Sequence, residues 1–223
     1  MIAFHGDSKI KSLYVDRVQA HAIADEIVHG TYWQHGKGCA VGCTIHSPEH
    51  RRYETELGIP MILARLEDRI FEGMQNGDSK EFPLRFISAI EPGADLSLVW
   101  YQFAHWFLVD PDDGVIKFAT TEKTKEAVNL VGSNLYGRAA RGLLVEKLEW
   151  ESAREVAYAA ADAAAADAPA AYAAAYAAAA AAYAAYAAAA AAAAYATAAR
   201  AAYKRQADKL IELLAAAPVA LAA

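Results

Sequence analysis

The chain has 223 residues, of which 22% are charged and 56% are hydrophobic, and its formal net charge is −6. This length allows one or two domains with a sizeable core. The acidic balance argues against a general nucleic-acid binder, because phosphate binding relies on clustered Lys and Arg. Two cysteines four residues apart do not make the disulfide framework of a small secreted protein, and the first residues lack a signal-peptide pattern, so we expect a cytoplasmic protein.

The composition changes near Trp150. All seven His, both Cys and all four Trp lie in residues 1–150, whereas residues 151–223 are mostly alanine with tyrosine as the regular large side chain. We therefore predict an all-α protein. A compact multi-helix domain over residues 1–150 is followed by a long Ala/Tyr-rich helical extension over residues 151–223.

Helix signals dominate the first region. Caps and apolar spacing predict helices over residues 8–29, 47–57, 60–73, 82–90, 96–108 and 121–135. Gly58 is a natural carboxyl cap for one of them, and Pro60 begins the next. Residues 30–46 are too rich in glycine for a good helix and are expected to form a structured loop. Residues 115–119 alternate weakly and are the one candidate strand.

From residue 143 the pattern predicts helix to about residue 214, with a break near Pro169. Asp167 can cap a new helix there, and proline is tolerated in a first helical turn. Residues 168–199 carry no charge and are long enough to span a bilayer. They contain no Leu, Ile, Phe or Val, which drive insertion, so we do not expect a membrane span.

Four tyrosines of the extension are spaced 4, 7 and 3 residues apart, as in the a/d seam of a coiled coil: Tyr172, Tyr176, Tyr183 and Tyr186. This seam could pack back on the domain or on the preceding helix. It could equally bind a second copy of the chain or a protein partner. Both interpretations stay open at this point.

The loop region carries a possible metal site in the pattern C-x3-C-x2-H-x3-H, formed by Cys39, Cys43, His46 and His50. Thiolates and imidazoles are zinc ligands, and four ligands suit a closed structural site. The side chains can converge only if the chain reverses before His50. The alternative is two buried thiols with surface histidines, which we favour because free cysteine is commonly buried. The cofactor is therefore unknown, with zinc less expected than none.

The same loop is also a candidate ligand site or thiol-enzyme site. A catalytic thiol needs a lowered pKa and a base within hydrogen-bond reach, and a histidine of the loop is the candidate base. The candidate ligand-binding residues are Trp33, His35, Lys37, Cys39, Cys43 and His46. No catalytic residue is assigned, and whether the chain is an enzyme stays open.

Three segments, GKGCAVGCTIH (36–46), ELGIP (56–60) and LEDRIFEG (66–73), resemble a group of uncharacterised bacterial and phage-associated proteins. The resemblance covers roughly the first 140 residues and the composition of the tail. It implies a bacterial or mobile-element setting and carries no activity, cofactor or catalytic residue.

Taken together, these patterns predict a non-enzymatic interaction or sequestering protein that uses helical surfaces. The alternative is a small-molecule-binding protein or thiol enzyme that uses the loop around Cys39, Cys43 and His46. Nucleic acid and membranes are not expected partners.

Overall fold

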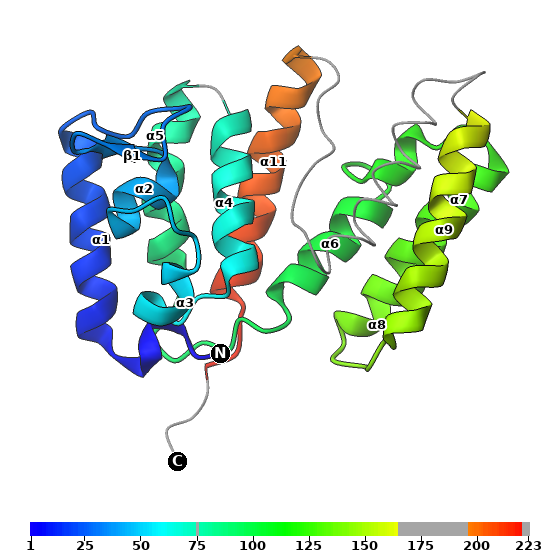
Figure 1. Ribbon diagram of the computed structural model, residues 1–223, viewed down its shortest axis with the longest axis horizontal. Coiled ribbons are helices and arrows are strands. Elements are labelled where there is room, and N and C mark those ends of the chain that lie inside the picture. Colours follow the sequence, from blue (N-terminus) through cyan, green and yellow to red (C-terminus); the bar gives the residue numbers. More distant parts are fainter. Residues whose placement is uncertain (75, 165–195, 220–223) are drawn as a thin grey trace. The chain divides into compact units, whose positions relative to one another are not determined.

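The computed structural model describes residues 1–74, 76–164 and 196–219, and these residues are mostly helical (Figure 1). The predicted all-α class is confirmed for these described residues. The contacts divide the described chain into two compact units. Unit 1 consists of residues 1–99 together with residues 196–219, and unit 2 consists of residues 100–164. The contacts therefore place the boundary between the two units after Val99, whereas the composition of the sequence changes near Trp150.

Unit 1 is a helical assembly with one small hairpin. Its elements in chain order are η1 (Ala3–Gly6), α1 (Ser8–Ile23), β1 (Trp33–Gln34), β2 (Lys37–Gly38), α2 (Ala40–Ile45), α3 (Arg52–Leu57), α4 (Met61–Gly73), α5 (Asn76–Ala89) and α11 (Ala196–Ala215). The strands β1 and β2 are antiparallel. The expected loop over residues 30–46 therefore contains a hairpin and a short helix.

The caps of unit 1 follow the sequence signals. The Asp7 side chain accepts a hydrogen bond from the backbone N–H of Lys9 and caps α1. Gly58 has a positive φ of 64° and ends α3 in the left-handed conformation that glycine adopts most readily. Pro60 then precedes α4, whose apolar side is buried in the core, including Leu63, Ile70 and Phe71. The boundary signals at Asp7, Gly58 and Pro60 are therefore confirmed, whereas α1 ends at Ile23 and α3 begins only at Arg52.

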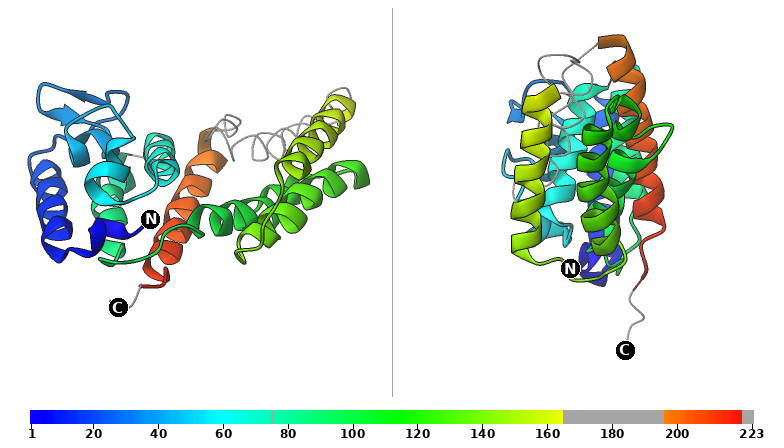
Figure 2. Two further views of the ribbon diagram at one scale, coloured as in Figure 1. Left: turned by 60° about the horizontal axis from the view of Figure 1, so that its bottom comes forward. Right: turned by 90° about the vertical axis from the view of Figure 1, so that its right-hand side faces the viewer.

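The carboxyl-terminal helix α11 completes unit 1. It lies beside α4 and α5 (Figures 1 and 2). Its buried side chains recur at helical spacing: Tyr203, Ala207, Leu210 and Leu214. A Cβ atom at Gly73 would lie 2.3 Å from the Tyr203 ring, so glycine is required where that ring packs on α4. An ion pair of 2.8 Å between Arg85 and Asp208 joins α5 to α11.

Unit 2 contains α6 (Val99–Val109), the 3-10 helix η2 (Val115–Phe118), α7 (Glu122–Asn129), the π-helical segment η3 (Leu130–Tyr136), α8 (Gly137–Ala139) and α9 (Lys147–Ala164). The alanines that face the core from α9 are fully buried, at Ala153, Ala157, Ala160 and Ala161. Small side chains allow α9 to approach α7 and η3 closely, and both helices contact it. This alanine stripe therefore packs within its own unit.

Two further expectations can be judged from the described residues. The strand predicted over residues 115–119 is wrong, because η2 occupies Val115–Phe118. None of the described helices has the length and apolar content needed to cross a bilayer.

Candidate functional site

The hairpin and α2 form the frame of the candidate site. His35 and Gly36 both have positive φ and make a two-residue turn between β1 and β2. Gly38 and Gly42 then let the backbone of Tyr32 lie directly against α2. An added Cβ would lie 2.2 Å from the Tyr32 carbonyl oxygen at Gly38 and 1.5 Å from it at Gly42. The glycines of this loop are therefore used for close backbone packing.

Both thiols of this region are buried in the core. The Cys43 thiol donates to the backbone oxygens of Gly38, at 3.3 Å, and Glu26, at 3.6 Å. Burial raises the pKa of Cys43 to about 12. Burial also raises the pKa of Cys39, and the neighbouring carboxylate of Asp68 raises it further. These shifts oppose formation of a thiolate, which is the nucleophilic form.

The structure does not assemble the four predicted zinc ligands. Cys39 and Cys43 are buried, whereas His46 is exposed and bonds to another histidine. The fourth, His50, lies 3.5 Å from a carboxylate oxygen of Asp68. Among residues 1–74, 76–164 and 196–219, no group of three or more His, Cys, Asp or Glu side chains is arranged to hold a metal ion.

A chain of two hydrogen bonds leads from a carboxylate to His46. The Oε2 atom of Glu26 lies 2.6 Å from Nδ1 of His21, and Nε2 of His21 lies 2.7 Å from Nε2 of His46. A carboxylate only accepts, so Nδ1 of His21 carries a proton. When both imidazoles are neutral, Nε2 of His21 must accept from His46, which leaves Nδ1 of His46 as an acceptor. We call these three residues the relay.

The indole of Trp33 fixes the far end of the relay. It stacks on the His46 ring with a centroid distance of 4.5 Å and an interplanar angle of 12°, and its edge contacts His21. His46 itself ends α2 with a left-handed backbone, φ 52° and ψ 41°. Non-glycine residues rarely adopt this conformation, and such positions concentrate at functional sites. The imidazole is therefore held on two sides and exposed on the remainder.

The charges around His46 favour its neutral form. Partial burial lowers its pKa most, and the nearby charges of Arg17, His21 and Arg52 lower it further. Glu26 acts in the opposite direction and is the smallest contribution. A neutral imidazole with a free acceptor nitrogen can take up a proton from a bound molecule.

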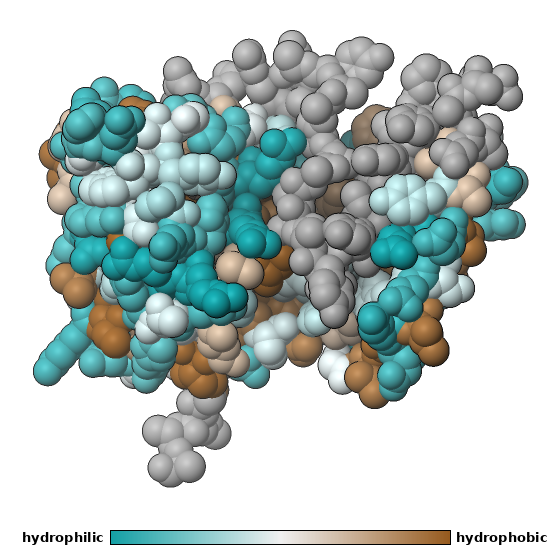
Figure 3. Space-filling model, viewed as in Figure 1, coloured by the Kyte–Doolittle hydropathy of each residue, from teal (hydrophilic) through white to brown (hydrophobic). Residues whose placement is uncertain are grey.

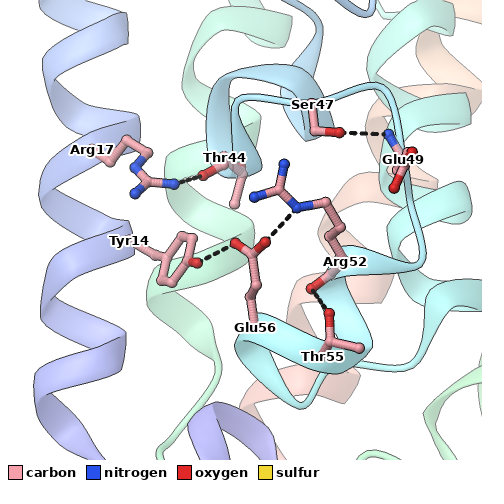
Figure 4. A network of polar contacts seen from close by, with 8 residues as sticks. All are labelled: Tyr14, Arg17, Thr44, Ser47, Glu49, Arg52, Thr55 and Glu56. Carbon is pink, nitrogen blue, oxygen red and sulfur yellow. Dashed lines mark hydrogen bonds and ion pairs between the residues drawn. The ribbon is translucent and has the colours of Figure 1, made fainter.

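A polar network beside the relay joins α1 to α2 and α3 (Figure 4). Arg17 donates to the Thr44 backbone oxygen at 2.9 Å, and its guanidinium lies 4.6 Å from the centre of the Tyr14 ring. The Tyr14 hydroxyl donates to Oε2 of Glu56 at 2.5 Å, and Arg52 donates to the other carboxylate oxygen. Burial and Glu56 raise the pKa of Tyr14 to about 12, so the hydroxyl stays a donor.

A second polar pair is fully buried below the loop. The Tyr53 hydroxyl of α3 donates to Oε2 of Glu67 in α4 at 2.7 Å. Burial raises the pKa of Glu67 well above its usual range, the hydrogen bond from Tyr53 lowers it, and the nearby Asp68 raises it further. Among the described residues, its Oε1 atom has no hydrogen-bond partner. This pair fastens α3 to α4 underneath the site.

Of the predicted ligand-binding residues, the structure brings Trp33 and His46 into contact and places Cys39 and Cys43 beneath them in the core. His35 and Lys37 are exposed on the hairpin. The residues that sequence reasoning missed are Tyr14, Arg17, His21, Glu26, Arg52 and Glu56. A signal for three of them was present, because positions 14, 17 and 21 share one face of a helix.

The tyrosine seam cannot be placed in this structure. Its four members, Tyr172, Tyr176, Tyr183 and Tyr186, lie outside the described residues.

Comparison with known proteins gives no relative from which a role could be transferred. No protein-family model matches the chain, and no curated protein or solved structure shows a significant match.

Proposed function

We propose that this protein binds a small polar molecule at the surface formed by the hairpin and α2, and that His46 exchanges a proton with that molecule. The observation that carries the proposal is the relay, which runs from a carboxylate through His21 to an exposed imidazole. General bases are commonly oriented by a carboxylate that bonds the imidazole, and here His21 stands between the carboxylate and the reacting ring.

The relay explains why His46, among the loop residues, is the reactive group. When Nδ1 of His46 accepts a proton, its Nε2–H continues to donate to His21. The positive charge is then stabilised along the hydrogen bonds toward Glu26. The buried thiols of Cys39 and Cys43 have raised pKa values and offer no comparable nucleophile. The proposal therefore keeps the small-molecule-binding function predicted for this loop, with the imidazole of His46 as the reactive group in place of a cysteine thiol.

The surroundings of His46 favour a polar ligand. The face of unit 1 turned to the viewer in Figure 3 is mostly hydrophilic. The indole of Trp33 offers one apolar contact next to the imidazole. A ligand that combines polar groups with a small flat part would use both features.

A thermal-shift panel tests the proposal. The probes are phosphorylated, carboxylated and neutral metabolites together with nucleotides, applied to the wild type, His21→Gln and His46→Asn. Asparagine is chosen because it tolerates the left-handed backbone. His5→Asn is the matched control, since His5 has a similar positive φ of 51° but lies in η1, outside the hairpin, α2 and the relay.

We expect at least one probe to raise the melting temperature of the wild type and of the control but of neither relay variant. If no probe stabilises the wild type, or if His46→Asn keeps the full shift, the proposal is wrong.

Self-association or partner binding through the tyrosine seam stays a prediction from sequence. It is separable from the ligand site, because Tyr176→Lys with Tyr183→Lys should lower the hydrodynamic size or partner capture and leave ligand binding intact. A cytoplasmic location is likewise an expectation from the sequence.

A further inference from the structure

In the polar network beside the relay, Arg17 and Arg52 each have N–H groups that donate to no other described residue. We propose that the molecule bound at His46 carries a phosphate group, which Arg17 and Arg52 hold beside the imidazole. This inference rests on the proposed function and names the chemical class of its ligand.

Arg17 is a positively charged group without an acidic partner. Within the described part of the chain, no carboxylate lies within ion-pair distance of it. Its polar contacts are the Thr44 oxygen and the Tyr14 side chain. A guanidinium has five N–H donors, so several remain for a ligand. Because α1 and the Tyr14 ring hold the guanidinium in place, little side-chain freedom is lost on binding.

Arg52 supplies a second fixed guanidinium. Its Nε atom donates to Glu56, which is itself held by the Tyr14 hydroxyl. Among the described residues, neither Nη atom of Arg52 has an acceptor. Figure 4 shows the two guanidinium groups on either side of Thr44, with α1 carrying Arg17 and α3 carrying Arg52. The donors thus come from two separate helices.

The imidazole completes this set from a third element. Arg17 donates to the backbone oxygen of Thr44, two residues before His46, and the Arg52 guanidinium lies on the other side of Thr44 (Figure 4). Two guanidinium groups from separate helices, joined by Nδ1–H of His46 once that nitrogen is protonated, suit the three oxygens of a phosphate better than the single plane of a carboxylate. A phosphate monoester carries about two negative charges at neutral pH, and this charge favours the protonated form of His46, whose Nδ1–H is then a third donor.

The charge balance also favours an anion at this position. Glu56 is shared between Tyr14 and Arg52, so it compensates one of the two guanidinium charges. The other, on Arg17, has no carboxylate within ion-pair distance among the described residues, and the nearest acidic group of the relay, Glu26, is bonded to His21. A doubly charged phosphate would pair with Arg17 and with the free edge of Arg52.

Calorimetric titration with inorganic phosphate at constant ionic strength tests the inference, with acetate as the carboxylate probe. We expect phosphate to bind the wild type and acetate to bind at least about tenfold more weakly. Arg17→Gln and Arg52→Gln should each weaken phosphate binding at least about tenfold, because each removes a charge-assisted hydrogen bond. Arg51→Gln is the control, since Arg51 is the exposed neighbour outside the network.

Arg52→Gln also breaks the bond to Glu56 and could disturb α3, so Arg17→Lys and Arg52→Lys accompany it. Each lysine keeps the charge but loses the forked donor, and we expect intermediate affinity. Circular dichroism identifies any variant that fails to fold. Equal binding of acetate and phosphate, or unchanged phosphate affinity in both glutamine variants, overturns the inference.

The two proposals fail in different ways. If the wild type does not bind phosphate while another probe still requires His46, the phosphate assignment is wrong and the ligand site stands. If phosphate binds through Arg17 and Arg52 but His46→Asn changes neither phosphate affinity nor any thermal shift, the role of His46 is wrong.

Discussion

The buried pair of Tyr53 and Glu67 allows a quantitative test of the packing below the site. The two side chains are almost completely buried, and one hydrogen bond of 2.7 Å joins them. We consider the single variants Tyr53→Phe and Glu67→Met and the double variant. These changes remove the hydroxyl, the carboxyl or both, with little change in side-chain volume.

The expected magnitudes follow from which polar atom each variant leaves unpaired. Tyr53→Phe deprives Glu67 of its donor while its Oε1 atom is already without a partner, so we expect a loss of about 2 kcal/mol. Glu67→Met removes a carboxyl that is costly to bury, and we expect a loss of at most about 1 kcal/mol. The double variant should be close to Glu67→Met. The two effects are then non-additive by about 2 kcal/mol.

The stability should also depend on pH through Glu67. Its pKa in the folded state is raised above that of the unfolded chain. Below the unfolded pKa both states are protonated, and the contribution to stability is fully present. As the pH rises, the unfolded state releases the proton first, and about 1.4 kcal/mol is lost per pH unit until the folded pKa is reached. Glu67→Met should lack this loss.

Hydrogen exchange of the α4 amides, measured by mass spectrometry at pH 5 and pH 8, reports the free energy of opening for this part of unit 1. The stability of Glu67→Met relative to the wild type should rise from pH 5 to pH 8. An identical pH dependence in both proteins would refute the raised pKa of Glu67, and additive single effects would refute its hydrogen bond with Tyr53.

Three further predictions concern other parts of unit 1. Gly42→Ala should destabilise the unit by about 3 kcal/mol or more, because the new Cβ meets a backbone oxygen at 1.5 Å. Gly77→Ala, where a Cβ meets nothing within 4 Å, is its control in thermal unfolding and should be neutral or stabilising. Leu210→Ala should cost about 2 to 5 kcal/mol, seen by calorimetry as a lower transition for unit 1 alone. Cys39 and Cys43 should react with a thiol reagent at pH 8 only after unfolding, and rapid labelling of native protein would contradict their burial.

The helices of unit 1 could be predicted because their signals are local. Gly58 and Pro60 mark boundaries through backbone geometry alone, and the apolar spacing of α4 identifies its buried side. The prediction of a strand over residues 115–119 was wrong. A weak alternation over five residues gives no partner strand for hydrogen bonding, and a 3-10 helix forms backbone hydrogen bonds within the same short segment. The hairpin was missed because its strands have only two residues each.

Only part of the candidate site could be predicted, because several of its contacts depend on how separate helices pack together. Trp33 and His46 were identified because the loop is unusual in composition. His21 and Glu26 join them through the approach of α1 to α2, which no spacing within the loop encodes. Arg17 shares a helical face with His21, and that pattern was readable, but its relation to Arg52 depends on the packing of α3.

The position of α11 in the sequence has a consequence for synthesis. Unit 1 receives its last helix only after residues 100–195 have been translated, which takes roughly 5 to 20 s at about 5 to 20 residues per second. During that interval the sides of α4 and α5 that will cover Leu210 and Leu214 have no helix against them. A nascent chain in this state exposes apolar surface to chaperones and to neighbouring chains on the same polysome. The order of translation, as well as the final packing, therefore determines when the scaffold beneath His46 becomes stable.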